Sequence, residues 1–248
     1  MKMIYEGVCD VGLKRQINQD SILIRENALQ EAYLYVVADG MGGHSHGERA
    51  SHMITEGLSA WWDTLFDGKT QWDLIHISRS LQSALMDINY HLFSQTDDGE
   101  ICGSTCIILL AYRDACITIS VGDSRVYRKR KRKIHSLMKD DVWENQREIQ
   151  EQFSEVDRKK NSNYGKLINA VGVNSNLSMT VQTYDLLPGD IFLLCSDGLY
   201  KYCDFSKVKK SLQWLTQKKL KERVKRLLSF VYNNGAPDNV SIILTKAL

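Results

Sequence analysis

Aspartates at the ends of apolar segments are the residues of this sequence best placed to do chemistry. Four such segments, each with the composition of a strand, have an aspartate at one end: Asp39, Asp123, Asp197 and Asp238. Asp39 and Asp197 are each followed by a glycine and then by a helical pattern, so neither pair is an ordinary hairpin turn. A glycine there would let the backbone carbonyl approach a ligand closely. Carboxylates from separate strands, joined by a glycine carbonyl, suit Mg²⁺ or Mn²⁺, which take oxygen ligands.

A cluster of this kind could hold two divalent cations about 3.5–4 Å apart and activate a water for attack on phosphorus. Such a set of oxygen ligands does not fit zinc, which prefers histidine and cysteine. His44 and His46 are two residues apart with no third histidine or cysteine nearby, so we interpret them as loop residues. Gly42, Gly43 and Gly47 could cradle a phosphate at the start of the following helix, but they match neither a P-loop nor a complete dinucleotide fingerprint.

The elements that must position these aspartates are short strands in groups and helices in pairs. β-Branched and aromatic residues predict strands at 6–12, 20–26, 32–39, 106–112, 115–121, 124–129, 179–185, 191–196 and 239–245. Apolar residues three to four apart predict helices over 47–62 and 74–92, a helix that carries Leu212 and Leu215, and a helix over 220–231 that ends before Gly235. Grouped strands with paired helices indicate a mixed α+β fold.

The composition is that of an ordinary globular protein. The 248 residues are 43% hydrophobic and 25% charged, with a net charge of +2, so we expect one domain over 1–248 without strong attraction to nucleic acid. No apolar run reaches the roughly 20 residues that span a bilayer, and Glu6 comes too early for a signal peptide. Six cysteines without a CxxC pair predict reduced, buried thiols, and we expect a cytoplasmic protein.

Two charged segments stand apart from the strand and helix patterns. The stretch from about 140 to 165 is polar throughout, and we expect an exposed helix and loop that cover part of the molecule. The run Arg128–Lys133 reads RKRKRK and predicts a solvated hairpin tip, with guidance of acidic or phosphorylated partners as the alternative. Nucleic-acid binding is not expected there, because no aromatic residues interleave the run.

Six motifs occur in a fixed order within the stretch from Gly7 to Thr245, which is nearly the whole chain: VGLKRQINQDS, VVADGMGGHSHGERAS, GSTCIILL, VGDSRVY, LLCSDGL and PDNVSIILT. In this order the sequence resembles the protein phosphatase 2C (PPM) family of metal-dependent Ser/Thr phosphatases, and especially its compact bacterial members. The resemblance implies a four-layer α-β-β-α sandwich, in which two antiparallel sheets are flanked by helix pairs and the metals lie at one end of the sheets.

The resemblance also assigns metal ligands. Asp39 would bridge two Mn²⁺ or Mg²⁺ ions, and the Gly40 carbonyl would bind one of them. Asp197 and Asp238 would complete the ligands of the first ion. Asp123 would help to hold a third, weaker ion.

Further roles around the ions follow from the same resemblance. Arg15 would bind the phosphate, for which the fixed fork of guanidinium donors is suited, and would be catalytic together with Asp39. Asp20, Gln19 and Asn239 would act around the ions through water or hydrogen bonds.

Three positions depart from the family pattern. Gln19 stands where many members have glutamate, so its neutral amide could orient a water but adds no charge. Met41 stands where animal members have a histidine thought to serve as general acid. Asp141 stands where a histidine commonly follows the aspartate that matches Asp140.

The implied function is hydrolysis of phosphoserine and phosphothreonine in proteins by a metal-activated water, without a cysteine nucleophile. The alternative is a catalytically silent module that binds phosphorylated partners; retention of Asp39, Asp197 and Asp238 argues against it. We expect phosphorylated proteins as partners, with a cognate Ser/Thr protein kinase by analogy. We also expect a monomer that binds neither nucleic acid nor membrane.

Overall fold

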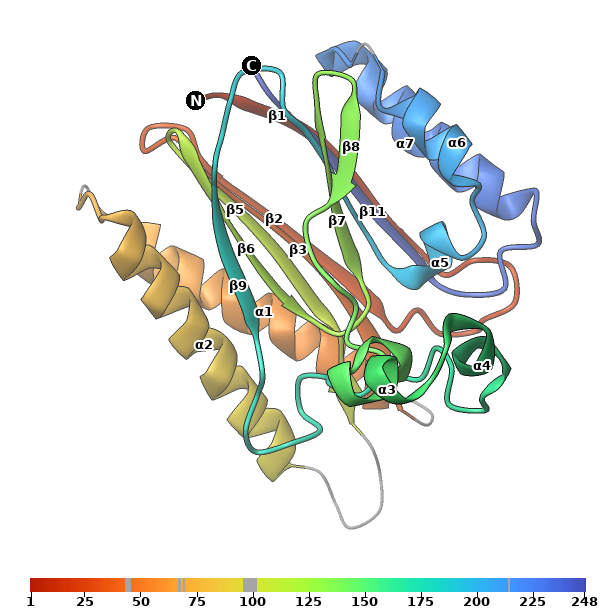
Figure 1. Cartoon of the computed structure of the whole chain (residues 1–248). Helices are drawn as coiled ribbons and strands as arrows, with labels where there is room; N and C mark the ends of the chain where they lie inside the picture. The colour runs from red at the N-terminus through yellow and green to blue at the C-terminus, as the bar shows by residue number, and fades with distance from the viewer. Residues whose placement is uncertain (43–45, 67, 69, 96–101, 214) are drawn as a thin grey trace.

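The computed structural model describes residues 1–42, 46–66, 68, 70–95, 102–213 and 215–248. Two antiparallel sheets face each other (Figure 1). The first sheet has the order β1 (Met3–Asp10), β11 (Val240–Ala247), β10 (Ile191–Cys195), β7 (Arg125–Arg130) and β8 (Lys133–Ser136). The second has the order β2 (Asp20–Asn27), β3 (Ala32–Met41), β5 (Cys106–Tyr112), β6 (Ala115–Val121) and β9 (Thr180–Asp185), with β4 (Gly103–Ser104) paired to the end of β3.

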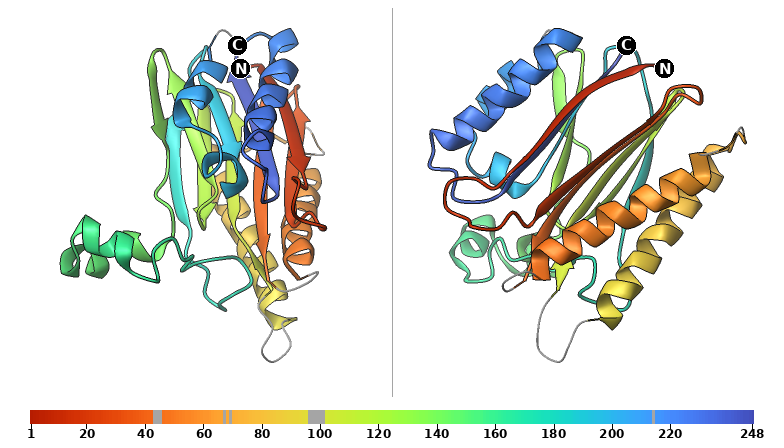
Figure 2. Two further views of the ribbon diagram at one scale, coloured as in Figure 1. Left: turned by 90° about the vertical axis from the view of Figure 1, so that its right-hand side faces the viewer. Right: turned by 180° about the vertical axis from the view of Figure 1, so that it is seen from behind.

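Helices cover the outer face of each sheet (Figures 1 and 2). The long helices α1 (His46–Phe66) and α2 (Leu74–Ser94) pack on the second sheet. The first sheet is covered by α5 (Asp197–Tyr200), α6 (Phe205–Ser211) and α7 (Gln217–Tyr232). The layers therefore follow the order α-β-β-α, and the predicted sandwich is confirmed.

Strand β3 shows how the sequence generates the layers. Alternate side chains of a strand point to opposite faces of its sheet, and both faces of this sheet are covered. The side chains from Ala32 to Ala38 are therefore all buried. Leu34 and Val36 pack among the helices α1 and α2, whereas Tyr35 lies between the two sheets. A strand buried on both faces reads as a continuous apolar run, which is why its position was predictable.

Two strands and one helix were not predicted correctly. The sequence analysis missed β4, which is two residues long, and β8, whose residues are mostly exposed. The helix expected around Leu212 and Leu215 is wrong in position: α6 ends at Ser211, and both leucines follow it while remaining buried. Its start is set by Asp204, whose carboxylate accepts a hydrogen bond from the Ser206 N–H.

The charged stretch near 140–165 forms the expected exposed excursion. It contains a 3-10 turn η1 (Trp143–Asn145) and two short helices, α3 (Arg147–Gln152) and α4 (Glu155–Lys160), which project from one end of the sandwich (Figure 2). Its base is held by Asp141, whose carboxylate accepts a hydrogen bond from the Gly122 N–H at 3.0 Å. The segment therefore begins next to Asp123.

All six cysteines are unpaired, as expected, and five of them are buried. None of the helices in the described ranges has both the length and the apolar character needed to cross a bilayer.

Candidate metal centre

The predicted aspartates come together at one end of the two sheets. Asp20 and Asp39 lie directly opposite each other on β2 and β3. Asp197 follows β10, Asp238 precedes β11, and Asp123 follows β6. The pKa of Asp39 lies well above its usual range, first because of burial and then because the other four carboxylates repel its negative charge. Both sheets thus contribute to one cluster.

Asp20 is the most enclosed member of the cluster, with only 3% of its surface exposed. The Ser196 hydroxyl donates to its Oδ2 at 2.8 Å, but its Oδ1 is buried and has no hydrogen-bond partner among the described residues. Burial, together with the charge of Asp197, raises the pKa of Asp20 to about 6. A buried carboxylate oxygen without a donor is costly in a folded protein unless a water or cation meets it.

The backbone of Asp39 is held by Thr105, whose hydroxyl in turn contacts Ser124. The Thr105 hydroxyl accepts from the Asp39 N–H at 3.0 Å, and the Thr105 N–H donates to the Asp39 carbonyl at 2.9 Å. The Thr105 hydroxyl is also 2.8 Å from the Ser124 hydroxyl. These contacts fix Asp39 relative to the chain that carries Asp123, and the GST and VGDS motifs supply them.

The structure gives a second reason why glycine, Gly40 or Gly198, follows Asp39 and Asp197: neither position has room for a side chain. A Cβ atom on Gly40 would lie 2.0 Å from the Gly47 carbonyl oxygen, and one on Gly198 would lie 1.9 Å from the Asn239 carbonyl oxygen. Both glycines therefore allow one stretch of backbone to pack directly on another. This packing draws the start of α1 against β3 and α5 against the start of β11.

Asn239 and Gln19 fix the loop between β1 and β2. The Asn239 side-chain amide donates to the carbonyl oxygens of Val11 and Ile17 at 3.0 and 3.1 Å, and its oxygen accepts from the Gln19 N–H at 2.9 Å. The Gln19 carbonyl in turn accepts from the Gly40 N–H at 3.0 Å. These bonds tie the loop to the aspartate strands of both sheets.

Arg15 lies in this loop and reaches the cluster. Its guanidinium meets Asp238 through two bonds: Nε is 3.0 Å from Oδ1 and Nη2 is 3.3 Å from Oδ2. The side chain is half exposed, and three of its five N–H groups remain outside this pair. The predicted phosphate-binding arginine is thus adjacent to the aspartates.

Lys201 is a member of the site that the sequence analysis missed. Its ammonium lies 2.6 Å from Asp197 Oδ2 and 3.8 Å from Asp123 Oδ2. Asp123 also accepts a hydrogen bond at 3.0 Å from the hydroxyl of Tyr200, whose ring is covered by the Arg125 guanidinium. Asp197 and Lys201 are four residues apart at the start of the helical pattern expected after Gly198, and this i,i+4 spacing is the signal that could have revealed the pair.

The chemistry of these donors fits hard divalent cations. No three His, Cys, Asp or Glu side chains form a ready-made cage within the described ranges. Mg²⁺ and Mn²⁺ need no such cage, because they use one or two carboxylates together with carbonyls and waters. The unpartnered Asp20 Oδ1 and the mutual repulsion around Asp39 both call for positive charge at this place. His44 and Gly43 lie outside the described residues.

A cysteine nucleophile does not fit the structure, although Cys9 and Arg15 do have the CxxxxxR spacing of cysteine phosphatases. Cys9 lies within β1, and its thiol contacts the Asp20 carbonyl oxygen, the Asn18 amide and the Ser241 hydroxyl. Burial raises the pKa of this thiol, which is the opposite of what a reactive thiolate requires.

Comparison with known proteins gives a consistent result. The profile of the family described as protein phosphatase 2C matches residues 14–245. Serine/threonine phosphatase stp of Listeria monocytogenes is 26% identical over 241 residues, which are 96% of this chain and 93% of the relative. The structure of the S. agalactiae serine/threonine phosphatase has a TM-score of 0.85 at 25% identity and covers 100% of both chains. The structure of the catalytic domain of the serine/threonine protein phosphatase PstP in complex with 2 manganese ions has a TM-score of 0.78 at 26% identity, covering 99% of each chain.

Proposed function

The chain belongs to the protein phosphatase 2C family, and from this premise we propose that its aspartate cluster hydrolyses phosphoserine and phosphothreonine in proteins with the help of Mn²⁺ or Mg²⁺. The observation that carries the proposal is the convergence of four carboxylates on Asp39 from separate strands of both sheets. We propose that residues 1–248 form one catalytic domain, because neither sheet supplies the cluster alone.

In this proposal Asp39, the Gly40 carbonyl, Asp197 and Asp238 hold two ions. When bound, the ions would polarise the phosphoryl group and activate a water for attack on phosphorus. Asp39 joins the two sheets at this point, since it lies on β3 whereas Asp197 and Asp238 flank strands of the other sheet.

The remaining side chains bind and orient. Arg15 offers its three remaining N–H groups to the phosphoryl oxygens, and Asp238 holds its guanidinium plane in place. Asn239 and Gln19 keep the loop of Arg15 at a fixed distance from β3. Asp20 Oδ1, which accepts no hydrogen bond from a described residue, is available as an acceptor for a water in the cluster.

A third ion at Asp123 would compete with the ammonium of Lys201. The Lys201 ammonium already contacts the Asp123 carboxylate and the neighbouring Asp197, so a cation placed between them would have to displace it. We therefore propose two ions in the core site, with Lys201 providing fixed positive charge beside them.

The wider setting follows the same proposal. Phosphorylated proteins would be the substrates, as the names of the bacterial relatives suggest, and a Ser/Thr protein kinase would supply them. The free cysteines support a reducing compartment such as the cytoplasm. We propose that the chain acts there as a monomer.

The proposal is tested with Asp39→Asn, which keeps the shape of the side chain and removes its charge. Mn²⁺-dependent hydrolysis of p-nitrophenyl phosphate and of a phosphothreonine peptide should fall by about 100-fold or more, as should hydrolysis by the native chain in excess EDTA. The matched control Asp87→Asn, on the exposed face of α2, should retain full activity. Undiminished turnover in Asp39→Asn, or capture of the phosphopeptide with its phosphate retained by the native protein, would contradict the proposal.

A further inference from the structure

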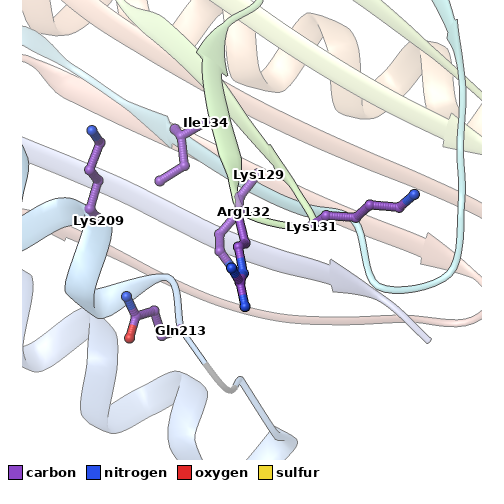
Figure 3. A pocket seen from close by; sticks show the side chains of 6 residues that line it. All are labelled: Lys129, Lys131, Arg132, Ile134, Lys209 and Gln213. Atoms are coloured by element: carbon purple, nitrogen blue, oxygen red, sulfur yellow. The ribbon is translucent and has the colours of Figure 1, made fainter.

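A basic groove lies on the outer face of the first sheet, at the end of β7 that is remote from the aspartates. It runs between the β7–β8 hairpin and α6 and encloses about 600 Å³ (Figure 3). The described residues that line it are Lys129, Lys131, Arg132, Ile134, Lys209 and Gln213. Lys209 lies on α6 and Gln213 in the segment after it, across the groove from the hairpin (Figure 3). Two elements far apart in sequence therefore build one concave surface.

The cations of this groove are not neutralised by the protein. Lys129, Lys131, Arg132 and Lys209 form no ion pair with another described residue. Arg130 differs from them, because it points to the other face of β7 and pairs with Asp185 and Asp190. The described lining also contains no carboxylate.

We propose that the groove docks an acidic segment of the phosphoprotein substrate, a proposal that rests on the phosphatase function proposed above. Four cations that form no ion pair with a described residue line one hollow and complement several carboxylates at once. The hollow also offers the partly buried Ile134 to an aliphatic side-chain stem. It has no aromatic side chain among its described lining residues on which a base could stack, which disfavours RNA as the occupant.

The position of the groove sets a requirement on the substrate. Strand β7 begins beside Asp123 at Arg125 and reaches the groove at its other end, Arg130. At a rise of about 3.3 Å per residue, this strand separates the groove from the metal centre by roughly 15–20 Å. An extended substrate would therefore need about six residues between its phosphorylated residue and its acidic segment.

The binding test uses a fluorescein-labelled peptide of eight Asp and Glu residues and measures anisotropy with the full chain. Arg132→Glu should weaken binding by about tenfold, and the double variant Arg132→Glu with Lys209→Glu should weaken it further, because each places a negative charge in the groove. Binding should also weaken between 50 and 200 mM salt. The matched control Arg79→Glu, on the exposed face of α2, should bind like the native chain. Equal affinity in Arg132→Glu and Arg79→Glu would overturn the proposal, as would tighter binding of an RNA octamer.

The kinetic test separates the groove from the catalytic centre. For a phosphothreonine peptide with an acidic run six residues away, the double variant should raise KM about tenfold with kcat unchanged, because docking contributes equally to substrate and transition state. The native chain and the double variant should hydrolyse p-nitrophenyl phosphate at the same rate. An unchanged KM in the double variant would overturn the proposal that the groove docks the substrate. If the native chain failed to hydrolyse p-nitrophenyl phosphate, the phosphatase proposal would be overturned instead. The anisotropy measurement would still test whether the groove binds an acidic peptide.

Discussion

At the scale of single residues, Lys201 is the least expected feature of the metal centre. It is one helical turn after Asp197, so its stem holds the ammonium beside two carboxylates that would otherwise repel each other. Burial lowers the pKa of Lys201, but the hydrogen bond and charge of Asp197, together with the charges of Asp123 and Asp39, raise it by more, and the side chain stays protonated. An internal cation of this kind takes up negative charge that would otherwise attract a further metal ion.

Lys201→Met should therefore increase cation binding, since methionine keeps much of the stem and removes the charge. We expect one additional Mn²⁺ per chain, or a weakest site at least tenfold tighter, in isothermal titration calorimetry of the metal-free protein. Lys221→Met on the exposed side of α7 serves as the control and should bind Mn²⁺ like the native chain. Identical stoichiometry and affinity in Lys201→Met would show that the ammonium does not compete with a cation.

At the scale of elements, the site depends on close contact between backbones. Helix α5 begins at Asp197 and packs on the chain just before β11, with Gly198 against the Asn239 carbonyl. The same kind of contact joins Gly40 to Gly47 at the start of α1. Because the opposing atoms belong to backbone in both places, they cannot move aside as the end of a flexible side chain could.

Gly198→Ala should separate α5 from β11 and so damage both stability and activity. Overpacking of this kind costs about 1–3 kcal/mol, which for a chain of this size corresponds to a fall of roughly 5 °C in Tm. Circular dichroism should record this fall, and p-nitrophenyl phosphate hydrolysis should drop with it. Gly68→Ala, where a Cβ would have no described neighbour closer than 3.8 Å, should leave both unchanged. A native Tm in Gly198→Ala would contradict the argument.

At the scale of the whole molecule, the cluster joins two sheets that otherwise meet through apolar side chains. The layer between them is formed by residues such as Tyr35, Leu109, Phe192, Leu194 and Ile243. The carboxylates of Asp20 and Asp39 belong to one sheet, and those of Asp197 and Asp238 flank the other. Ions held between them should therefore stabilise the packing of the sheets as well as serve the reaction.

Saturating Mn²⁺ should raise the Tm of the native, EDTA-treated chain, because a ligand that binds only the folded state stabilises it. At about 100 times Kd the gain is about 2.7 kcal/mol, or roughly 5–10 °C for this size. Asp39→Asn should lose most of this shift, and Asp87→Asn should retain it, in differential scanning calorimetry. An equal shift in Asp39→Asn would indicate that the ions bind elsewhere.

Much of the fold could be predicted because its elements are local patterns. The apolar run of β3 and the three-to-four spacing in α1 and α2 each depend on residues within one segment. Strand β8 escaped detection because its residues are mostly exposed and its only support is pairing with β7. The leucines after α6 are buried by the tertiary structure without being helical, and spacing could not distinguish these two causes.

The identity of the aspartates, the glycines that follow two of them and the order of the motifs could all be taken from the sequence, since residue type and order do not depend on folding. Only the tertiary structure joined Arg15 to Asp238, which is 223 positions further along, and placed Lys201 between two carboxylates. It also opposed α6 to the β7–β8 hairpin to form the basic groove. Such contacts follow from how the sheets and helices pack on one another, and that packing leaves no periodic trace in any one segment.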